Sequence, residues 1–130
     1  MTELKIEGTS STPNIILDKN SGKFEIKGKS FPEESRIFYE PVFEWLNQYE
    51  KEPNDETLFE FKMEYFNSSS SLIILEILNV LDSIYKKEKK VTVLWNYLEI
   101  DEDMLDAGEE YSDLVSIPFE YNALQEADLE

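Results

Sequence analysis

The sequence predicts a single α/β domain in which a mixed β-sheet with an N-terminal hairpin carries helices mainly on one face. Segments that alternate apolar and charged residues are separated by helical patterns, which is typical of strand–helix–strand units. The alternating segments keep their charged residues on one face, whereas a sheet covered on both faces has strands that are apolar on both sides. With 130 residues, the chain fits one domain with a sizeable core.

The N-terminal third predicts a β-hairpin. Residues 4–6 favour a short strand or a tethered arm, and residues 14–17 favour a strand. Residues 18–22, Asp-Lys-Asn-Ser-Gly, are typical of a hairpin turn, with Gly22 where a positive φ is expected. Residues 24–28 then return as an alternating strand.

Two helices are expected over residues 30–51. Ser30 has the character of an N-cap, because Pro32 and two glutamates follow in what would be the first turn. Pro41 lacks an N–H, so we expect it to break or kink the helix near residues 39–40 and a second helix to run from 41 to about 51.

A strand–helix–strand unit follows. Residues 57–66 alternate, with one face formed by Phe59, Phe61, Met63 and Tyr65. A strongly apolar helix is expected over about 69–86 and another strand over 91–97, which predicts a right-handed unit with parallel pairing. No run approaches the roughly 20 apolar residues that span a bilayer, so no membrane association is expected.

The C-terminal part is acidic. Residues 99–115 show a weak helical face that Gly108 interrupts, and residues 117–121 favour a short edge strand, where Pro118 is tolerated. We expect residues from Ala123 onward to fray, which divides the chain into a domain over 1–122 and an acidic tail over 123–130.

Composition excludes several classes of function. The net charge is −17, and twelve carboxylates but no basic residue follow Lys90, so direct nucleic acid binding is disfavoured. The absence of His and Cys removes the usual zinc ligands, disulfides and Ser-His-Asp or Cys-His catalysis. There is no Walker loop and no GxGxxG, and we expect no cofactor. A cytoplasmic, non-enzymatic protein is the prediction.

The stretch Tyr65-Phe66-Asn67-Ser68-Ser69-Ser70-Ser71 is the candidate site, because it joins the predicted strand to the apolar helix. Asn and Ser are natural caps for the free N–H groups at a helix start. The same N–H groups and the helix dipole favour an anion, so a serine at this position can also be a phosphorylation switch. The residues alone leave both interpretations open.

The sequence resembles the SiaC family of bacterial regulatory phosphoproteins and, more distantly, the STAS domains of anti-sigma factor antagonists. The resemblance rests on short segments in a shared order: Gly8-Thr9-Ser10-Ser11-Thr12-Pro13, Phe31-Pro32-Glu33-Glu34-Ser35, Tyr65-Phe66-Asn67-Ser68-Ser69-Ser70 and Pro118-Phe119. They span nearly the whole chain.

The resemblance implies a STAS-like fold and a signalling adaptor. In the family the residue after the Asn is phosphorylated, which implies Ser68 here, with Ser69 as second choice since Ser71 extends the hydroxyl run. It also implies that Asn67, Ser68, Ser69 and Ser70 contact partners. These partners would be a protein kinase, a PP2C-type phosphatase and a diguanylate cyclase that the unphosphorylated form activates.

Other interpretations remain at this stage. The protein could sequester a basic partner as an acidic decoy or anti-sigma antagonist-type protein, or be a carboxylate-based hydrolase using Glu40 and Glu44. Residues 101–103 (Asp-Glu-Asp) lack the spacing and glycine of an EF-hand, so acids at a helix start are the better interpretation. Aromatic residues on the first helical face could stack on a ligand, although core packing is favoured: Tyr39, Trp45 and Tyr49.

Overall fold

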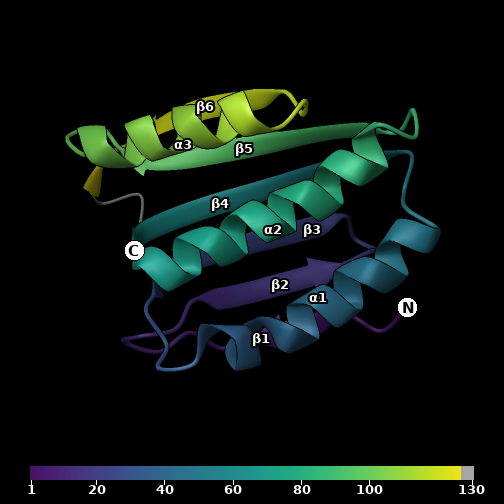
Figure 1. The fold of residues 1–130 in the computed structure, drawn as a ribbon, viewed down its shortest axis with the longest axis horizontal. Coiled ribbons are helices and arrows are strands. Elements are labelled where there is room, and N and C mark those ends of the chain that lie inside the picture. The colour runs from purple at the N-terminus through teal and green to yellow at the C-terminus, as the bar shows by residue number, and fades with distance from the viewer. Residues whose placement is uncertain (127–130) are drawn as a thin grey trace.

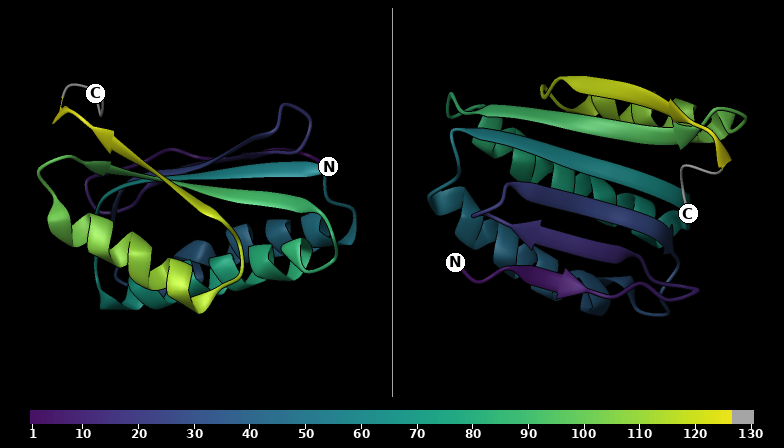
Figure 2. Two further views of the ribbon diagram at one scale, coloured as in Figure 1. Left: turned by 90° about the horizontal axis from the view of Figure 1, so that it is seen from above. Right: turned by 180° about the vertical axis from the view of Figure 1, so that it is seen from behind.

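The computed structural model describes residues 1–126, which form a six-stranded sheet with the strand order β1-β2-β3-β4-β5-β6 and three helices. The helices lie side by side on one face of the sheet (Figure 1), and the view from above shows the other face uncovered (Figure 2). The elements are β1 (Leu4–Ile6), β2 (Asn14–Asp18), β3 (Lys23–Ser30), α1 (Ser35–Lys51), β4 (Glu56–Phe66), α2 (Ser68–Tyr85), β5 (Lys90–Leu98), α3 (Glu102–Leu114) and β6 (Phe119–Leu124). The predicted mixed α/β sheet with helices mainly on one face is confirmed.

The N-terminal hairpin forms as expected. β2 pairs antiparallel with both β1 and β3. In the turn, the Asp18 carboxylate accepts hydrogen bonds from the Asn20 N–H at 3.1 Å and the Ser21 hydroxyl at 2.8 Å, and Gly22 has a φ of 76°. A side chain that bonds its own turn and a glycine with positive φ are what such a turn requires.

The remaining pairs, β3–β4, β4–β5 and β5–β6, are all parallel, and one helix connects the strands of each pair. Crossover connections between parallel strands are almost always right-handed. Because each new strand is added on the same side of the one before it, the right-handed connections place all three helices on the same face of the sheet. This order explains why one face of the sheet is covered and the other is exposed to solvent.

The core lies between the helices and the covered face. It includes the fully buried Trp95 of β5 and, from β4, Phe59 and Phe61. By length and composition, α2 is the one helix of the described part that could cross a membrane. In this fold its apolar side is instead packed in the core, with the buried residues Ile73, Ile74, Ile77, Leu78, Leu81 and Ile84.

The expected helix start at Ser30 and the break at Pro41 are both wrong. Ser30 is the buried last residue of β3, and the Phe31 N–H donates to the Ser11 carbonyl at 2.8 Å, which keeps the chain extended before Pro32. α1 then runs through Pro41 as one helix. Buried residues before and after Pro41 hold both halves against the core, which outweighs the one lost backbone bond: Tyr39, Val42, Trp45, Leu46 and Tyr49.

Tyr65 does not share the face of Phe59, Phe61 and Met63 as expected. Gly28 pairs with Met63 but Lys29 pairs with Tyr65, so β4 carries an extra residue in a β-bulge. The bulge turns Tyr65 outward, where it is 51% exposed and meets the Phe31 ring edge-on at 5.8 Å.

Gly108 does not interrupt α3. A Cβ at this position would lie 2.5 Å from Cδ1 of Trp95, so the glycine allows the helix to pack against the Trp95 ring. The expected edge strand is confirmed as β6, which extends through Leu124, so Ala123 and Leu124 belong to the sheet rather than to a frayed tail. Residues 127–130 of the expected tail lie outside the described residues.

Candidate functional site

The residues of the candidate site lie where β4 ends and α2 begins, at the end of the sheet where the parallel strands terminate. The Asn67 N–H donates to the Ser30 carbonyl at 3.0 Å, and the Phe31 N–H donates to the Ser11 carbonyl. Three of the segments that carried the resemblance therefore meet here. The fourth, Pro118-Phe119, lies toward the other end of β5, where the Pro118 carbonyl accepts from the Val93 N–H.

Asn67 is the N-cap of α2, as predicted. Its Oδ1 accepts hydrogen bonds from the Ser70 N–H at 2.9 Å and from the Ser69 hydroxyl at 3.1 Å. The first helical bond runs from the Ser71 N–H to the Asn67 carbonyl at 2.9 Å. One side chain therefore fixes the start of the helix.

Ser70 has a structural role. It is fully buried, and its hydroxyl lies 2.8 Å from that of Ser30, which in turn lies 2.7 Å from the Tyr39 hydroxyl. Burial raises the pKa of Tyr39 to about 12, so this phenol stays protonated near neutral pH. The three hydroxyls link α2, β3 and α1 below the surface, and a kinase cannot reach Ser70 without opening the fold.

Ser69 and Ser71 are also bonded. The Ser69 hydroxyl lies 2.8 Å from the hydroxyl of Ser35 at the start of α1, in addition to its bond with Asn67. The Ser71 hydroxyl donates to the Ser68 carbonyl at 2.7 Å, and the Tyr111 hydroxyl of α3 donates to the Ser71 carbonyl at 2.8 Å. The start of α2 is thus joined to both neighbouring helices.

Ser68 differs from the other three serines. It is exposed on the first turn of α2, and its hydroxyl has no hydrogen-bond partner within residues 1–126. The N–H groups of Ser68 and Ser69 precede the first helical bond and likewise have no acceptor in this part of the chain. An exposed free hydroxyl beside two free N–H groups at the positive end of a helix suits an added anion.

The alternative chemistries find no support in the geometry. Glu40 and Glu44, the residues considered for a carboxylate-based hydrolase, are both exposed on α1. Asp101 is the N-cap of α3 and accepts from the Met104 N–H at 3.0 Å, as expected for an acid at a helix start. Within the described residues no three metal-binding side chains cluster. The aromatic residues proposed for ligand stacking are buried in the core instead: Tyr39, Trp45 and Tyr49.

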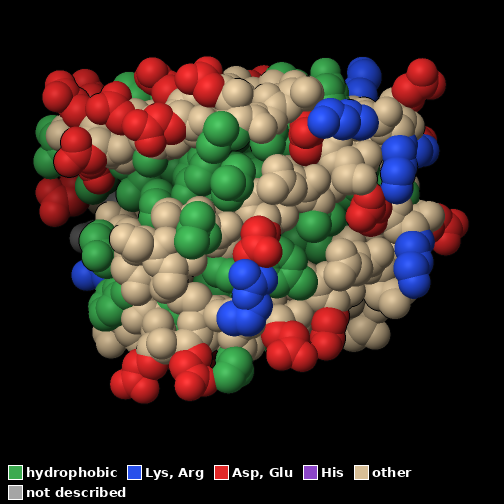
Figure 3. Space-filling model, in the orientation of Figure 1, with side chains coloured by type: hydrophobic (Ala, Val, Ile, Leu, Met, Phe, Trp, Pro, Cys, Tyr) green, Lys and Arg blue, Asp and Glu red, His purple; other side chains and the backbone are tan. Residues whose placement is uncertain are grey.

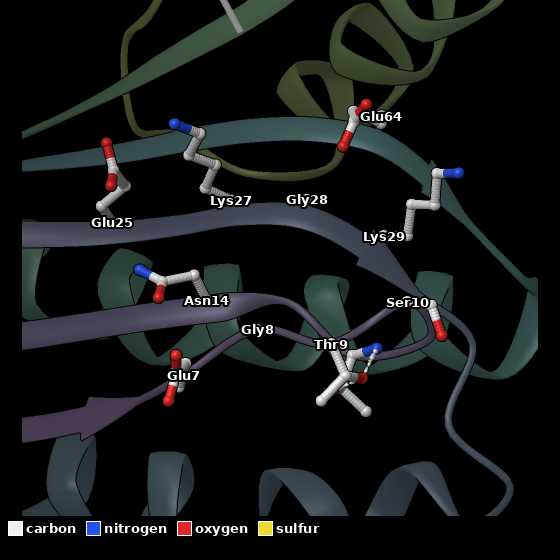
Figure 4. A pocket seen from close by; sticks show the side chains of 11 residues that line it. Glu7, Gly8, Thr9, Ser10, Asn14, Glu25, Lys27, Gly28, Lys29 and Glu64 are labelled. Carbon is white, nitrogen blue, oxygen red and sulfur yellow. Dashed lines mark hydrogen bonds between the residues drawn. The ribbon is translucent and has the colours of Figure 1, made fainter. Parts of the chain in front are cut away.

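The uncovered face of the sheet carries a hollow that no sequence pattern predicts, shown in Figure 4. It measures about 640 Å³ and lies between the β1–β2 loop and strands β2 to β4. Lys27 and Lys29 line it without an ion pair in the described chain, but Glu7 and Glu64 line it too. The hollow therefore carries charges of both signs, and the β-bulge that brings Glu64 to it has no sequence signal.

The chain is similar to known proteins over almost its whole length. The model of the SiaC family regulatory phosphoproteins matches residues 6–124. An uncharacterized protein of Pseudomonas aeruginosa (strain UCBPP-PA14) is 29% identical over 126 residues, which cover 97% of this chain and 100% of that protein.

Solved structures are similar over almost the same length. The crystal structure of apo-SiaC from P. aeruginosa matches with a TM-score of 0.86 and 28% identity, over 95% of this chain and 100% of that one. The crystal structure of the diguanylate cyclase SiaD in complex with its activator SiaC, also from P. aeruginosa, contains a chain that matches with a TM-score of 0.86 and 28% identity, over 93% of this chain and 99% of that one.

Proposed function

The chain belongs to the SiaC family of regulatory phosphoproteins, and we propose that it is a non-enzymatic adaptor that binds and activates a diguanylate cyclase while Ser68 is unphosphorylated. Support for the cyclase comes from the similarity to SiaC, which is described as the activator of SiaD in the structure of their complex. Support for Ser68 as the switch comes from one observation: it is the exposed serine of the α2 start whose hydroxyl has no partner in the described chain.

A phosphate on Ser68 is compatible with the fold. It adds about −1.5 to −2 charges and three strong acceptors. The free N–H groups of Ser68 and Ser69 and the helix dipole offer local stabilisation, and no hydroxyl bond of the folded state is lost. Phosphorylation should therefore leave the protein folded.

Phosphorylation is expected to weaken partner binding. A partner that packs over Ser68 would have to bury the phosphate without a matching cation, and an uncompensated buried charge costs about 3–5 kcal/mol. A kinase or a PP2C-type phosphatase, by contrast, needs only an exposed residue 68. The modification then changes binding rather than folding.

The first test is intact-mass analysis and phosphopeptide mapping of the protein purified from its native host, with and without phosphatase treatment. One phosphate on Ser68 is expected. A phosphate on Ser69 would move the switch by one residue, and no phosphate under any growth condition would overturn it.

The second test measures cyclic di-GMP formation by the diguanylate cyclases of the same host, with wild-type protein, Ser68→Ala and Ser68→Asp. Wild type and Ser68→Ala should stimulate one cyclase, and Ser68→Asp should not. Equal stimulation by all three proteins contradicts the switch. If removing the acidic residues after Leu124 abolished partner binding while changes at Ser68 had no effect, the decoy function would be favoured instead.

A further inference from the structure

The start of α2 lies beside a groove that α1 and α2 form together. The groove measures about 380 Å³ and is lined by Glu33, Glu34, Ser35, Arg36, Ile37, Ser69, Leu72 and Ile73. Two cross-links join the helices along it: the Ser35–Ser69 hydroxyl pair at 2.8 Å and the Arg36–Glu76 ion pair at 2.8 Å. These two contacts bridge the walls of the groove.

Two aliphatic side chains stand exposed on the walls of this groove. Leu72 of α2 is 64% exposed and Ile37 of α1 is 63% exposed, while Ile73 is buried at 3%. Leu72 follows Ser68 by four residues and so shares its face of the helix. Exposed aliphatic residues this close to a regulated serine suggest a contact surface.

The charge around the groove points to the kind of partner. Glu33 and Glu34 line the groove and form no ion pair within residues 1–126, while its one cation, Arg36, is engaged by Glu76. Figure 3 shows acidic side chains gathered over α3 and along the edge below α1, with a largely uncharged band over the start of α2 between them. An apolar centre with an acidic rim is complementary to an apolar segment flanked by Lys or Arg. A second copy of this chain is a poorer match, because its net charge is −17 and the lysines of its basic cluster, residues 86–90, already pair with its own carboxylates.

We propose that the α1–α2 groove receives an amphipathic segment of the effector, whose aliphatic side chains cover Leu72 and Ile37 and whose Lys or Arg side chains meet Glu33 and Glu34. This inference rests on the proposed function and identifies the surface by which it acts. It also explains how a phosphate on Ser68 can weaken binding even when the partner carries Lys or Arg. A phosphate on Ser68 would stand one helical turn before Leu72, next to the groove, where a partner that covers Leu72 would also have to desolvate it. The cost of this desolvation outweighs the screened attraction to cations at the rim.

The test measures the dissociation constant of the unphosphorylated protein for the host cyclase that the wild type stimulates, by calorimetry at low and at high salt. The double variant Ile37→Ala/Leu72→Ala should bind roughly tenfold or more weakly, as for apolar residues at the centre of an interface. The matched control is Leu114→Ala on α3, where the leucine is 62% exposed outside the groove; it should change binding less than about twofold. Glu33→Gln/Glu34→Gln should weaken binding at low salt and reduce its dependence on salt.

The outcomes separate this proposal from the proposed function. If the wild type binds a cyclase and Ile37→Ala/Leu72→Ala binds equally well, the groove is not the contact surface, although the adaptor function stands. The same conclusion follows if only Leu114→Ala weakens binding. If the wild type binds none of the host cyclases, the proposed function fails and this inference fails with it. Circular dichroism of each variant checks that it is folded, which is expected because the substituted side chains are exposed.

Discussion

A carboxylate placed at Ser68 or at Ser70 should have opposite effects on the free energy of unfolding. Ser68→Asp puts a charge on the exposed first turn of α2, where the helix dipole and free N–H groups stabilise it by about 0.3–1 kcal/mol. Ser70→Asp puts the charge where Ser70 is fully buried and removes its hydroxyl from the contact with Ser30 at 2.8 Å. An unpaired buried charge costs about 3–5 kcal/mol, which is a large part of the roughly 5–15 kcal/mol stability of a typical domain.

The assay is urea unfolding followed by tryptophan fluorescence, with Ser70→Ala as the control that removes the hydroxyl alone, at a cost of about 1 kcal/mol. A second measurement uses pH. Burial should raise the pKa of the carboxyl at position 70 above its unfolded value of about 3.9. The destabilisation relative to wild type should therefore be smallest below about pH 4, where this carboxyl is protonated in both the folded and the unfolded state. It should grow as the pH rises from about 4 to the folded pKa, and stay constant above it. A loss of stability in Ser68→Asp as large as in Ser70→Asp would refute the reasoning.

Three further predictions concern the scaffold. Gly108→Ala should destabilise the protein by up to about 2 kcal/mol in urea unfolding, because the new Cβ lies 2.5 Å from the Trp95 ring and overpacking, at about 1–3 kcal/mol, exceeds the ~1 kcal/mol gain in helix propensity. A net gain in stability would show that the ring moves freely. Pro41→Ala should raise the stability by about 1–3 kcal/mol by restoring the bond to the Ile37 carbonyl, and an unchanged urea midpoint would contradict this. The phenol of Tyr39 has a pKa near 10 in the unfolded chain and of about 12 in the folded protein. The free energy of unfolding should therefore fall by roughly 2–3 kcal/mol between pH 10 and pH 12, and this fall should be smaller in Tyr39→Phe.

The order and type of the elements could be predicted because most segments follow one clear pattern. The alternation in β4 and the apolar pattern of α2 describe the observed elements closely. The errors arise where contacts distant in sequence override a local signal. Ser30 has the context of a helix cap, but its hydroxyl bonds Ser70 and Tyr39 inside the protein. Gly108 alone predicts a helix break, but in the fold it lies against the Trp95 ring, where a larger side chain would not fit.

The candidate site was only partly accessible from the sequence. Capping by Asn67 follows from local chemistry, and the structure confirms it. The hydroxyls of Ser70 and Ser69 are engaged by Ser30 of β3 and Ser35 of α1, and the sequence does not show these contacts between distant segments. The groove beside Ser68 was missed for the same reason, because Ile37 and Leu72 appear in the sequence as ordinary members of apolar helical patterns.

The uninterrupted strand order has a consequence for synthesis on the ribosome. Phe24 pairs with Phe59, Phe59 with Val93, and Val93 with Phe119, so each strand has its partner in the strand made just before it. A unit of this kind takes about thirty residues, and no strand has to be inserted between two that are already paired. The sheet can therefore grow from the hairpin toward β6 as the chain emerges, and the residues around Ser68 can dock on Ser30 and Ser35 before α3 has been translated.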